Sequence, residues 1–128
     1  MEKDFDGWNI QKKKIHSRDK NIFFHEREVW WCSLGVNIGF EQDGKNNLFE
    51  RPVLILKKFN KHVLWVVPLS TRNKENPYYF PITSAEGSFV ILSQLRLISS
   101  KRLQRLMYKL PKQQFMQVNE RIKKLLEE

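Results

Sequence analysis

The sequence predicts a mainly β fold, a small and mostly antiparallel β-barrel of five or six short strands that ends in a C-terminal α-helix. Two observations predict it. Short apolar runs alternate with polar or glycine-containing turns from residue 26 onward, and an apolar stripe with helical spacing follows Pro111. We divide the 128 residues into an N-terminal, partly helical extension, residues 1–25, and a barrel domain, residues 26–128.

The extension is expected to contain a short helix, because Trp8 and Ile15 are seven residues apart and would share one helix face. We expect Trp8, or the pair Phe23 and Phe24, to dock on the barrel domain. A disordered arm is the alternative reading of this segment.

The first strands follow a simple order. Residues 27–34 are rich in β-forming residues and end at a glycine. A polar loop follows over residues 35–50, and loops of this length are usually functional or mobile. Pro52 begins an apolar strand, where its missing N–H is tolerated. A tight turn at residues 60–61 leads into the next strand, residues 62–69, so these two strands form a hairpin.

The remaining elements are shorter strands and a final helix. Ser99 and Ser100 are suited to cap a single helical turn, and Pro111 suits the first turn of the final helix. Later strands are expected over residues 77–82, 88–92 and 106–110. The apolar residues of the final helix are spaced by three and four and form one stripe: Phe115, Val118, Ile122 and Leu125.

The chain is strongly basic, with 23 Lys and Arg against 14 Asp and Glu and a net charge of +9. This excess favours an anionic partner, which is a nucleic acid, an acidic protein or an anionic membrane surface. A basic protein that is merely soluble is the plainer alternative. The run from Lys12 to Lys14 is expected to be a solvated helix face, with contact to RNA or a protein partner as the other reading.

Cys32 is the only cysteine, so no intramolecular disulfide can form, which favours a reducing, cytoplasmic location. Its neighbours predict a buried structural thiol rather than a nucleophile. The three histidines are far apart and have no partner at metal-ligand spacing, so no metal site is expected. We also expect neither a secretory signal nor a membrane span.

A positive charge and two hydroxyl groups stand at the ends of neighbouring apolar strands. Arg51 begins one strand, and Ser70 and Thr71 end the next. A guanidinium offers a fixed fork of donors that matches phosphate oxygens, so this combination suits phosphate chemistry. The plainer readings are an ion pair of Arg51 with Glu50 or Glu28 and a strand-end cap by the serine hydroxyl.

Six short motifs occur in one order along the chain: Glu28-Val29-Trp30-Trp31, Gly39-Phe40-Glu41-Gln42, Arg51-Pro52-Val53-Leu54, Val67-Pro68-Leu69-Ser70-Thr71, Gln94-Leu95-Arg96 and Lys101-Arg102-Leu103. Together they resemble the MazF/PemK family of bacterial toxins, the endoribonuclease halves of type II toxin–antitoxin pairs, over roughly residues 26–126. The resemblance implies an SH3-like, PemK-type barrel that forms a homodimer. It also implies cleavage of single-stranded RNA, often messenger RNA, at short sequences without a metal or cofactor, leaving 2′,3′-cyclic phosphate and 5′-hydroxyl ends. A small acidic antitoxin would neutralise the toxin.

The resemblance also assigns catalytic residues. The family's catalytic arginine corresponds to Arg51. Its catalytic threonine corresponds to Ser70, with Thr71 beside it as the other candidate hydroxyl.

Further residues are candidates for RNA contact. The family's Glu-Gln pair corresponds to Glu41 and Gln42, in the loop that flanks the substrate groove, and its glutamine near the fifth strand corresponds to Gln94. Phe40 and Phe49 could stack on bases, at about 1–3 kcal/mol each, or hold the loop on its own barrel. Side chains that could line a cationic groove are Lys45, Arg72, Lys74 and Arg96.

The chain departs from the family pattern in several places. Ser70 stands where a threonine is commoner, the loop before Arg51 is longer by residues 43–50, and residues 1–25 have no counterpart. A second class of function is a non-catalytic interaction module on the same barrel, either a CcdB-like topoisomerase poison or a nucleic-acid-binding adaptor. The presence of both Arg51 and Ser70 favours cleavage, because a pure binder has no need of both.

Overall fold

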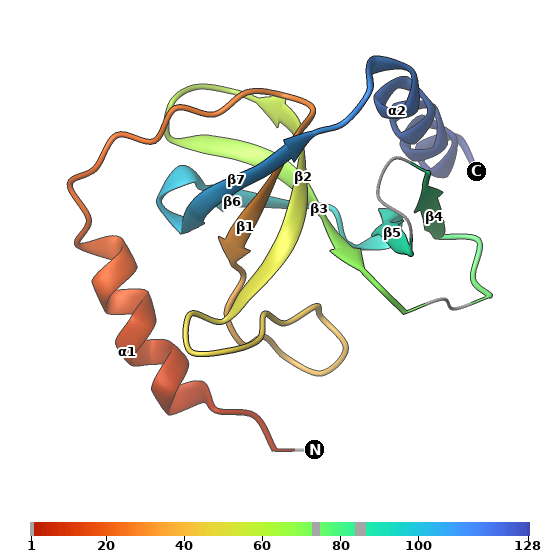
Figure 1. Cartoon of the computed structure of the whole chain (residues 1–128). Coiled ribbons are helices and arrows are strands. Elements are labelled where there is room, and N and C mark those ends of the chain that lie inside the picture. Colours follow the sequence, from red (N-terminus) through yellow and green to blue (C-terminus); the bar gives the residue numbers. More distant parts are fainter. Residues whose placement is uncertain (1, 73–74, 84–86) are drawn as a thin grey trace.

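The computed structural model describes residues 2–72, 75–83 and 87–128, and in these ranges seven strands form one bent sheet between two helices (Figure 1). Two single turns of 3-10 helix, η1 (Leu92–Gln94) and η2 (Ser100–Arg102), flank the sixth strand. The helices and strands in chain order are α1 (Phe5–His16), β1 (Glu28–Ser33), β2 (Glu50–Lys58), β3 (Val63–Ser70), β4 (Tyr79–Ile82), β5 (Ser88–Ile91), β6 (Arg96–Ser99), β7 (Leu103–Lys109) and α2 (Lys112–Glu127).

The sheet has the strand order β4-β5-β3-β2-β1-β7, and β6 pairs with β3 beside this path. Every pair is antiparallel. The mainly β class with an N-terminal and a C-terminal helix is therefore confirmed. The predicted barrel, however, is not closed. The turn η2 redirects the chain between β6 and β7, and no ladder joins these two strands in the described ranges.

Two apolar clusters cover opposite faces of the central strands, which explains why the middle of β2 and most of β3 are apolar. Along β2, Val53 and Ile55 contribute to the first cluster and Leu54 to the second, as the alternation of side chains in a strand requires. The first cluster gathers side chains from β1, β2, β3, β6 and β7. The second lies between the sheet and α2, where Val118 is fully buried.

The helical stripe of α2 is confirmed. Val118 is buried, and the other three predicted members pack partly against the second cluster: Phe115, Ile122 and Leu125. Pro111 is the residue just before the helix rather than part of its first turn. Neither helix in the described ranges has the length and apolarity that crossing a bilayer requires.

The extension forms α1 and docks on the barrel domain, so the disordered-arm reading is wrong. Trp8 and Ile15 are both buried, as their spacing predicts. Of the phenylalanine pair, Phe24 is fully buried in the first cluster and Phe23 is 82% exposed. Figure 1 shows α1 on the side of the sheet opposite α2, beside the loop between β1 and β2.

Two further local predictions have clear outcomes. The β2–β3 hairpin is confirmed, and the Asn60 side-chain oxygen accepts from the backbone N–H groups of His62 and Val63 in its turn. The cap of the helical turn is also confirmed, because the Ser99 hydroxyl accepts from the N–H of Lys101 at 3.2 Å. The strand β6 was not predicted, and β7 begins three residues earlier than expected.

Candidate active site

Arg51 and Ser70 meet because β2 and β3 form an antiparallel hairpin. The register pairs Val53 with Pro68 and Leu54 with Val67. Continued by two residues, the same register places Arg51 opposite Ser70. Residues opposite each other in an antiparallel pair project from the same face of the sheet. The hairpin therefore brings the guanidinium and the hydroxyl to one end of the two strands.

The guanidinium of Arg51 is oriented by main-chain and side-chain acceptors. Its Nε donates to the carbonyl oxygen of Asp43 at 2.7 Å, and its Nη1 donates to the carbonyl oxygen of Leu69 at 3.1 Å. In the amide orientation that satisfies both side chains, the Gln42 oxygen accepts from Nη2 at 2.8 Å and from Nε at 3.1 Å. These bonds engage three of the five N–H groups, so one on Nη1 and one on Nη2 remain for a ligand.

The plainer reading of Arg51, an ion pair with a neighbouring glutamate, is not what the described ranges show. Glu50 is buried and pairs with Arg105 at 2.8 Å. Glu28 accepts from the indole N–H of Trp30 at 3.0 Å. The charge of Arg51 is therefore not cancelled by either of these carboxylates.

The surroundings of Arg51 act on its charge in both directions. Burial lowers the pKa of Arg51 below its ordinary value, and the positive charge of Arg72 lowers it further, while Asp43 and Tyr79 raise it. An arginine starts from so high a pKa that it remains protonated at neutral pH. The site therefore holds a fixed cation that is partly removed from water, which strengthens its attraction to an anion.

A cavity of about 340 Å³ lies in front of these groups. Arg51, Ser70 and Thr71 all line it, and Lys45 adds a second cation. Ser70 is half-buried, and its oxygen accepts from the N–H of Arg72 at 3.2 Å, which leaves its own O–H free to donate. Thr71 is exposed. The lining thus combines the cations Arg51 and Lys45 with hydroxyl groups, including those of Ser70 and Thr71, and these are donors that suit a phosphodiester.

A second cavity of about 390 Å³ gathers four of the residues expected to contact RNA: Glu41, Gln42, Gln94 and Arg96. Gln42 lines this second cavity, and Arg51 lines the first one. The side chain of Gln42 contacts Arg51. The Gln42–Arg51 pair therefore stands at the boundary between the two cavities.

Gln94 fixes the loop between β1 and β2 in place. Its side-chain oxygen accepts from the N–H of Gln42 at 3.2 Å, and its amide nitrogen donates to the carbonyl of Phe40 at 3.2 Å. Glu41 stays within its own loop, where it accepts from the N–H of Ile38 at 3.0 Å. Gln94 thus acts on Arg51 indirectly, through the position of Gln42.

The remaining candidates lie in different surroundings. Phe40 is 95% exposed, so its ring is free for stacking. Phe49 packs against Trp8 with ring centroids 5.6 Å apart, which favours its role in holding the loop. Arg72 is exposed near Arg51. Lys74 lies outside the described residues.

Sequence reasoning missed the acceptor role of Asp43 and the buried pair of Glu50 and Arg105. Asp43 acts through its main-chain carbonyl, which no side-chain pattern can reveal. Arg105 also lies over the ring of Trp31 at 5.0 Å, so an arginine, a carboxylate and an indole form the wall next to the first cavity. The sequence of the last strand, which also contains Gln104 and Lys109, carries no clear signal for the role of Arg105.

Cys32 is fully buried in the first cluster, as predicted for a structural thiol. Burial raises its pKa to about 12, although Arg102 and Arg96 partly oppose this shift and Glu50 adds to it. In residues 2–72, 75–83 and 87–128, no group of three or more His, Cys, Asp or Glu side chains is arranged to hold a metal ion.

Comparisons with known proteins bear on the family and the fold of the chain. A family model described as PemK-like, MazF-like toxin of type II toxin–antitoxin systems matches residues 25–126. No curated protein sequence matches the chain.

Solved structures share the fold at low sequence identity. MazF (Form-I) from Deinococcus radiodurans is 21% identical with a TM-score of 0.68, covering 84% of this chain and 99% of that one. The MazE–MazF complex (Form-III) from the same organism is 18% identical with a TM-score of 0.65, covering 82% and 97%. An endoribonuclease in complex with its cognate antitoxin from Mycobacterial species is 14% identical with a TM-score of 0.64, covering 81% and 95%.

Proposed function

Since the chain belongs to the PemK-like, MazF-like toxin family of type II toxin–antitoxin systems, we propose that it is a sequence-specific endoribonuclease. Its substrate is single-stranded RNA, including messenger RNA. Cleavage needs no metal and leaves 2′,3′-cyclic phosphate and 5′-hydroxyl ends.

One observation carries this proposal: Arg51, with two N–H groups available, lines the same cavity as the half-buried hydroxyl of Ser70. In the reaction the 2′-oxygen of the RNA attacks the adjacent phosphorus, and the bond from phosphorus to the 5′-oxygen breaks. The 2′-hydroxyl loses its proton and the departing 5′-oxygen gains one, so atoms and charges balance. Negative charge grows on the non-bridging phosphate oxygens, where a preorganised guanidinium stabilises the transition state most.

Ser70 and Thr71 supply the second part of the mechanism. We assign the main role to the Ser70 hydroxyl, which donates to a non-bridging oxygen and helps to hold the phosphate in line for attack. Removal of one donor of this kind typically lowers the rate about 10²–10³-fold. Thr71, exposed beside it, is the alternative hydroxyl.

The flanking nucleotides extend along the second cavity. Glu41, Gln42 and Gln94 offer carboxylate and amide groups for base edges. Exposed Phe40 stacks on a base, whereas Phe49 supports the loop. The described cations Lys45, Arg72 and Arg96 neutralise backbone phosphates, and Lys74, which lies outside the described residues, is a further candidate from its charge alone.

The partners follow from the family and the charge. The net charge of +9 suits a small acidic antitoxin that competes with RNA for the same basic surface. We further propose that the toxin acts as a homodimer in the cytoplasm. The solved structures with similar folds include toxins bound to their antitoxins.

The direct test is incubation of the purified protein with a long single-stranded RNA in excess EDTA, followed by analysis of the fragment ends. We expect discrete fragments with cyclic phosphate and 5′-hydroxyl ends. Fragments that form only when a divalent metal is restored would contradict metal independence. RNA binding without any cleavage would point to the non-catalytic module instead.

A further inference from the structure

We propose that Lys3, just before α1, positions the guanidinium of Arg51 through Asp43. Lys3 lies outside the residues that the family model matches, so the extension would supply part of the site's support. This inference rests on the proposed function, because it takes Arg51 as the catalytic cation.

Lys3 is bound to the loop between β1 and β2 by every donor it has. Its Nζ donates to the carbonyl oxygens of Asn37 at 2.6 Å and Gly39 at 2.8 Å, and it pairs with Oδ2 of Asp43 at 3.0 Å. An ammonium group has three N–H donors, so these acceptors use them all. The side chain is only 9% exposed, which is unusual for a lysine and shows that the contact is ordered.

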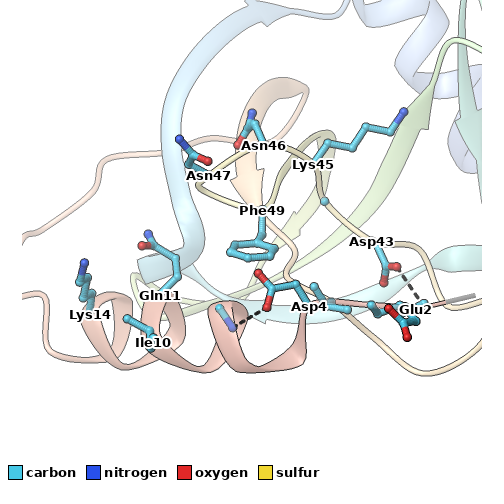
Figure 2. A pocket seen from close by; sticks show the side chains of 14 residues that line it. Glu2, Asp4, Ile10, Gln11, Lys14, Asp43, Lys45, Asn46, Asn47 and Phe49 are labelled. Atoms are coloured by element: carbon cyan, nitrogen blue, oxygen red, sulfur yellow. Dashed lines mark hydrogen bonds and ion pairs between the residues drawn. The ribbon is translucent and has the colours of Figure 1, made fainter.

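Asp43 connects Lys3 to the site. One of its carboxylate oxygens pairs with Lys3, and the other accepts from the N–H of Asn37 at 2.6 Å. Its main-chain carbonyl accepts from Nε of Arg51 at 2.7 Å. The carboxylate of Asp43 thus faces Lys3 and Asn37, while its main-chain carbonyl faces the guanidinium. Figure 2 shows the Asp43 carboxylate pointing from the loop toward the segment before α1.

Trp8 secures the two ends of the same loop. Its ring packs on Phe49, and a Cβ on Gly35 would lie 2.1 Å from Cε2 of the indole, so only glycine fits there. The N–H of Gly35 in turn donates to the carbonyl of Phe49 at 3.1 Å. Figure 2 shows the Phe49 ring between α1 and the loop. The extension therefore contacts the loop at its beginning, middle and end.

The loop needs this support because part of its backbone is strained. Phe49 has a φ value of 53°, in the left-handed region that a bulky non-glycine residue occupies only when its surroundings hold it there. Two acceptors of Arg51, the Asp43 carbonyl and the Gln42 side chain, belong to this loop. A displacement of about 1 Å in a catalytic group can lower a rate about 10²-fold, so the order of the loop bears directly on catalysis.

The test compares Lys3→Met with Lys20→Met, which removes an exposed lysine of the same segment. In the full chain, Lys3→Met should lower kcat on an RNA oligonucleotide about 10- to 100-fold and change KM less than about threefold. Lys3→Arg should restore most of the rate, and Lys20→Met should match the wild type. Asp43→Asn removes the ion pair but keeps the main-chain carbonyl, and it should lower kcat as Lys3→Met does.

A second readout does not depend on activity. Hydrogen exchange at the Nε–H of Arg51, followed by NMR, should be slow in the wild type and at least about tenfold faster in Lys3→Met. An unchanged kcat in folded Lys3→Met, or a rise in KM alone, would overturn the positioning role. If the wild type cuts no RNA, or Arg51→Ala cuts as fast as the wild type, the proposed function fails instead. In that case the exchange measurement alone tests whether Lys3 orders Arg51. An Nε–H exchange rate in Lys3→Met equal to that of the wild type would refute it.

Discussion

Arg51 on β2 donates from Nη1 to the carbonyl oxygen of Leu69 on β3 at 3.1 Å. This bond joins the two strands at the end where the candidate hydroxyls lie, because Leu69 immediately precedes Ser70. It ties the guanidinium to the main chain of β3, next to the candidate hydroxyls. A site supported by strands keeps its geometry better than one built on loops alone.

The two candidate hydroxyls are separable by single substitutions. Ser70→Ala should lower the cleavage rate about 10²-fold, because the half-buried Ser70 follows the residue that Arg51 contacts. Thr71→Val, which keeps the shape of the exposed side chain, should lower it less than about fivefold. Single-turnover rates on one RNA substrate measure both. A larger loss of rate in Thr71→Val than in Ser70→Ala would assign the catalytic role to Thr71.

Gln94 should affect activity more than stability. Gln94→Ala removes the two hydrogen bonds that fix Gln42 and Phe40 at 3.2 Å each, so the loop should exchange its amide hydrogens faster. We expect kcat to fall about tenfold and the free energy of unfolding to fall by less than about 1 kcal/mol. Gln117→Ala, on the exposed face of α2, is the matched control. An equal activity in both variants would show that Gln94 does not support the site.

The pair of Glu50 and Arg105 should matter for stability. Arg105→Ala leaves a carboxylate that is 3% exposed without its cation and should lower the free energy of unfolding by about 1–3 kcal/mol. The effect stays below that of a fully buried pair because the Arg105 side chain is 54% exposed and screened by water.

Lys123→Ala provides the comparison for that substitution. Lys123 pairs with Glu120 at 3.5 Å, and both side chains are 65% exposed. Its removal should change the free energy of unfolding by less than about 0.5 kcal/mol. Urea denaturation measures both variants, and similar losses would contradict the importance of burial at Glu50.

Cys32 gives the folded state a pH dependence in the alkaline range. The thiol has an ordinary pKa of 9.0, and burial raises the pKa of Cys32 to about 12 in the folded protein. Above pH 9 the unfolded chain loses this proton first, so unfolding becomes more favourable as the pH rises. The thiol's contribution is therefore complete below pH 9 and is lost as the pH approaches the folded value.

Comparison with Cys32→Ala isolates that contribution from the lysines and tyrosines that titrate in the same range. The difference in the free energy of unfolding between the wild type and the variant should be flat below about pH 8. Above pH 9 the free energy of unfolding of the wild type should fall relative to that of the variant by about 1.4 kcal/mol per pH unit. A difference that stays constant across this range would contradict the burial of an un-ionised thiol.

The parts of the fold that follow from local pattern were predictable. The β2–β3 hairpin has a turn with Asn60 between two apolar runs, and α2 has a stripe centred on Val118. The strand β6 was not predictable, because its four residues lie between two 3-10 turns and derive their conformation from pairing with β3. Closure of the sheet likewise depends on long-range pairing, which the sequence pattern does not specify.

The candidate site divides in the same way. Arg51 and Ser70 were identified from their positions at strand ends and from the resemblance, and the hairpin register explains why they meet. The supports of the site were not predictable, because they act through main-chain carbonyls of Asp43 and Leu69. The contact of Lys3 with Asp43 spans 40 residues of sequence, and no local signal marks it.

The most direct test of the central claim is the single-turnover cleavage rate of Arg51→Ala in excess EDTA, measured together with its affinity for the same RNA. We expect the rate to fall at least about 10³-fold while the affinity changes less than about tenfold, because the guanidinium acts mainly on the transition state. Arg51→Lys keeps the charge but loses the fork of donors, so its cleavage rate should lie between those of the wild type and Arg51→Ala. If Arg51→Ala cleaves as fast as the wild type, Arg51 is not the catalytic cation and the proposed site is wrong.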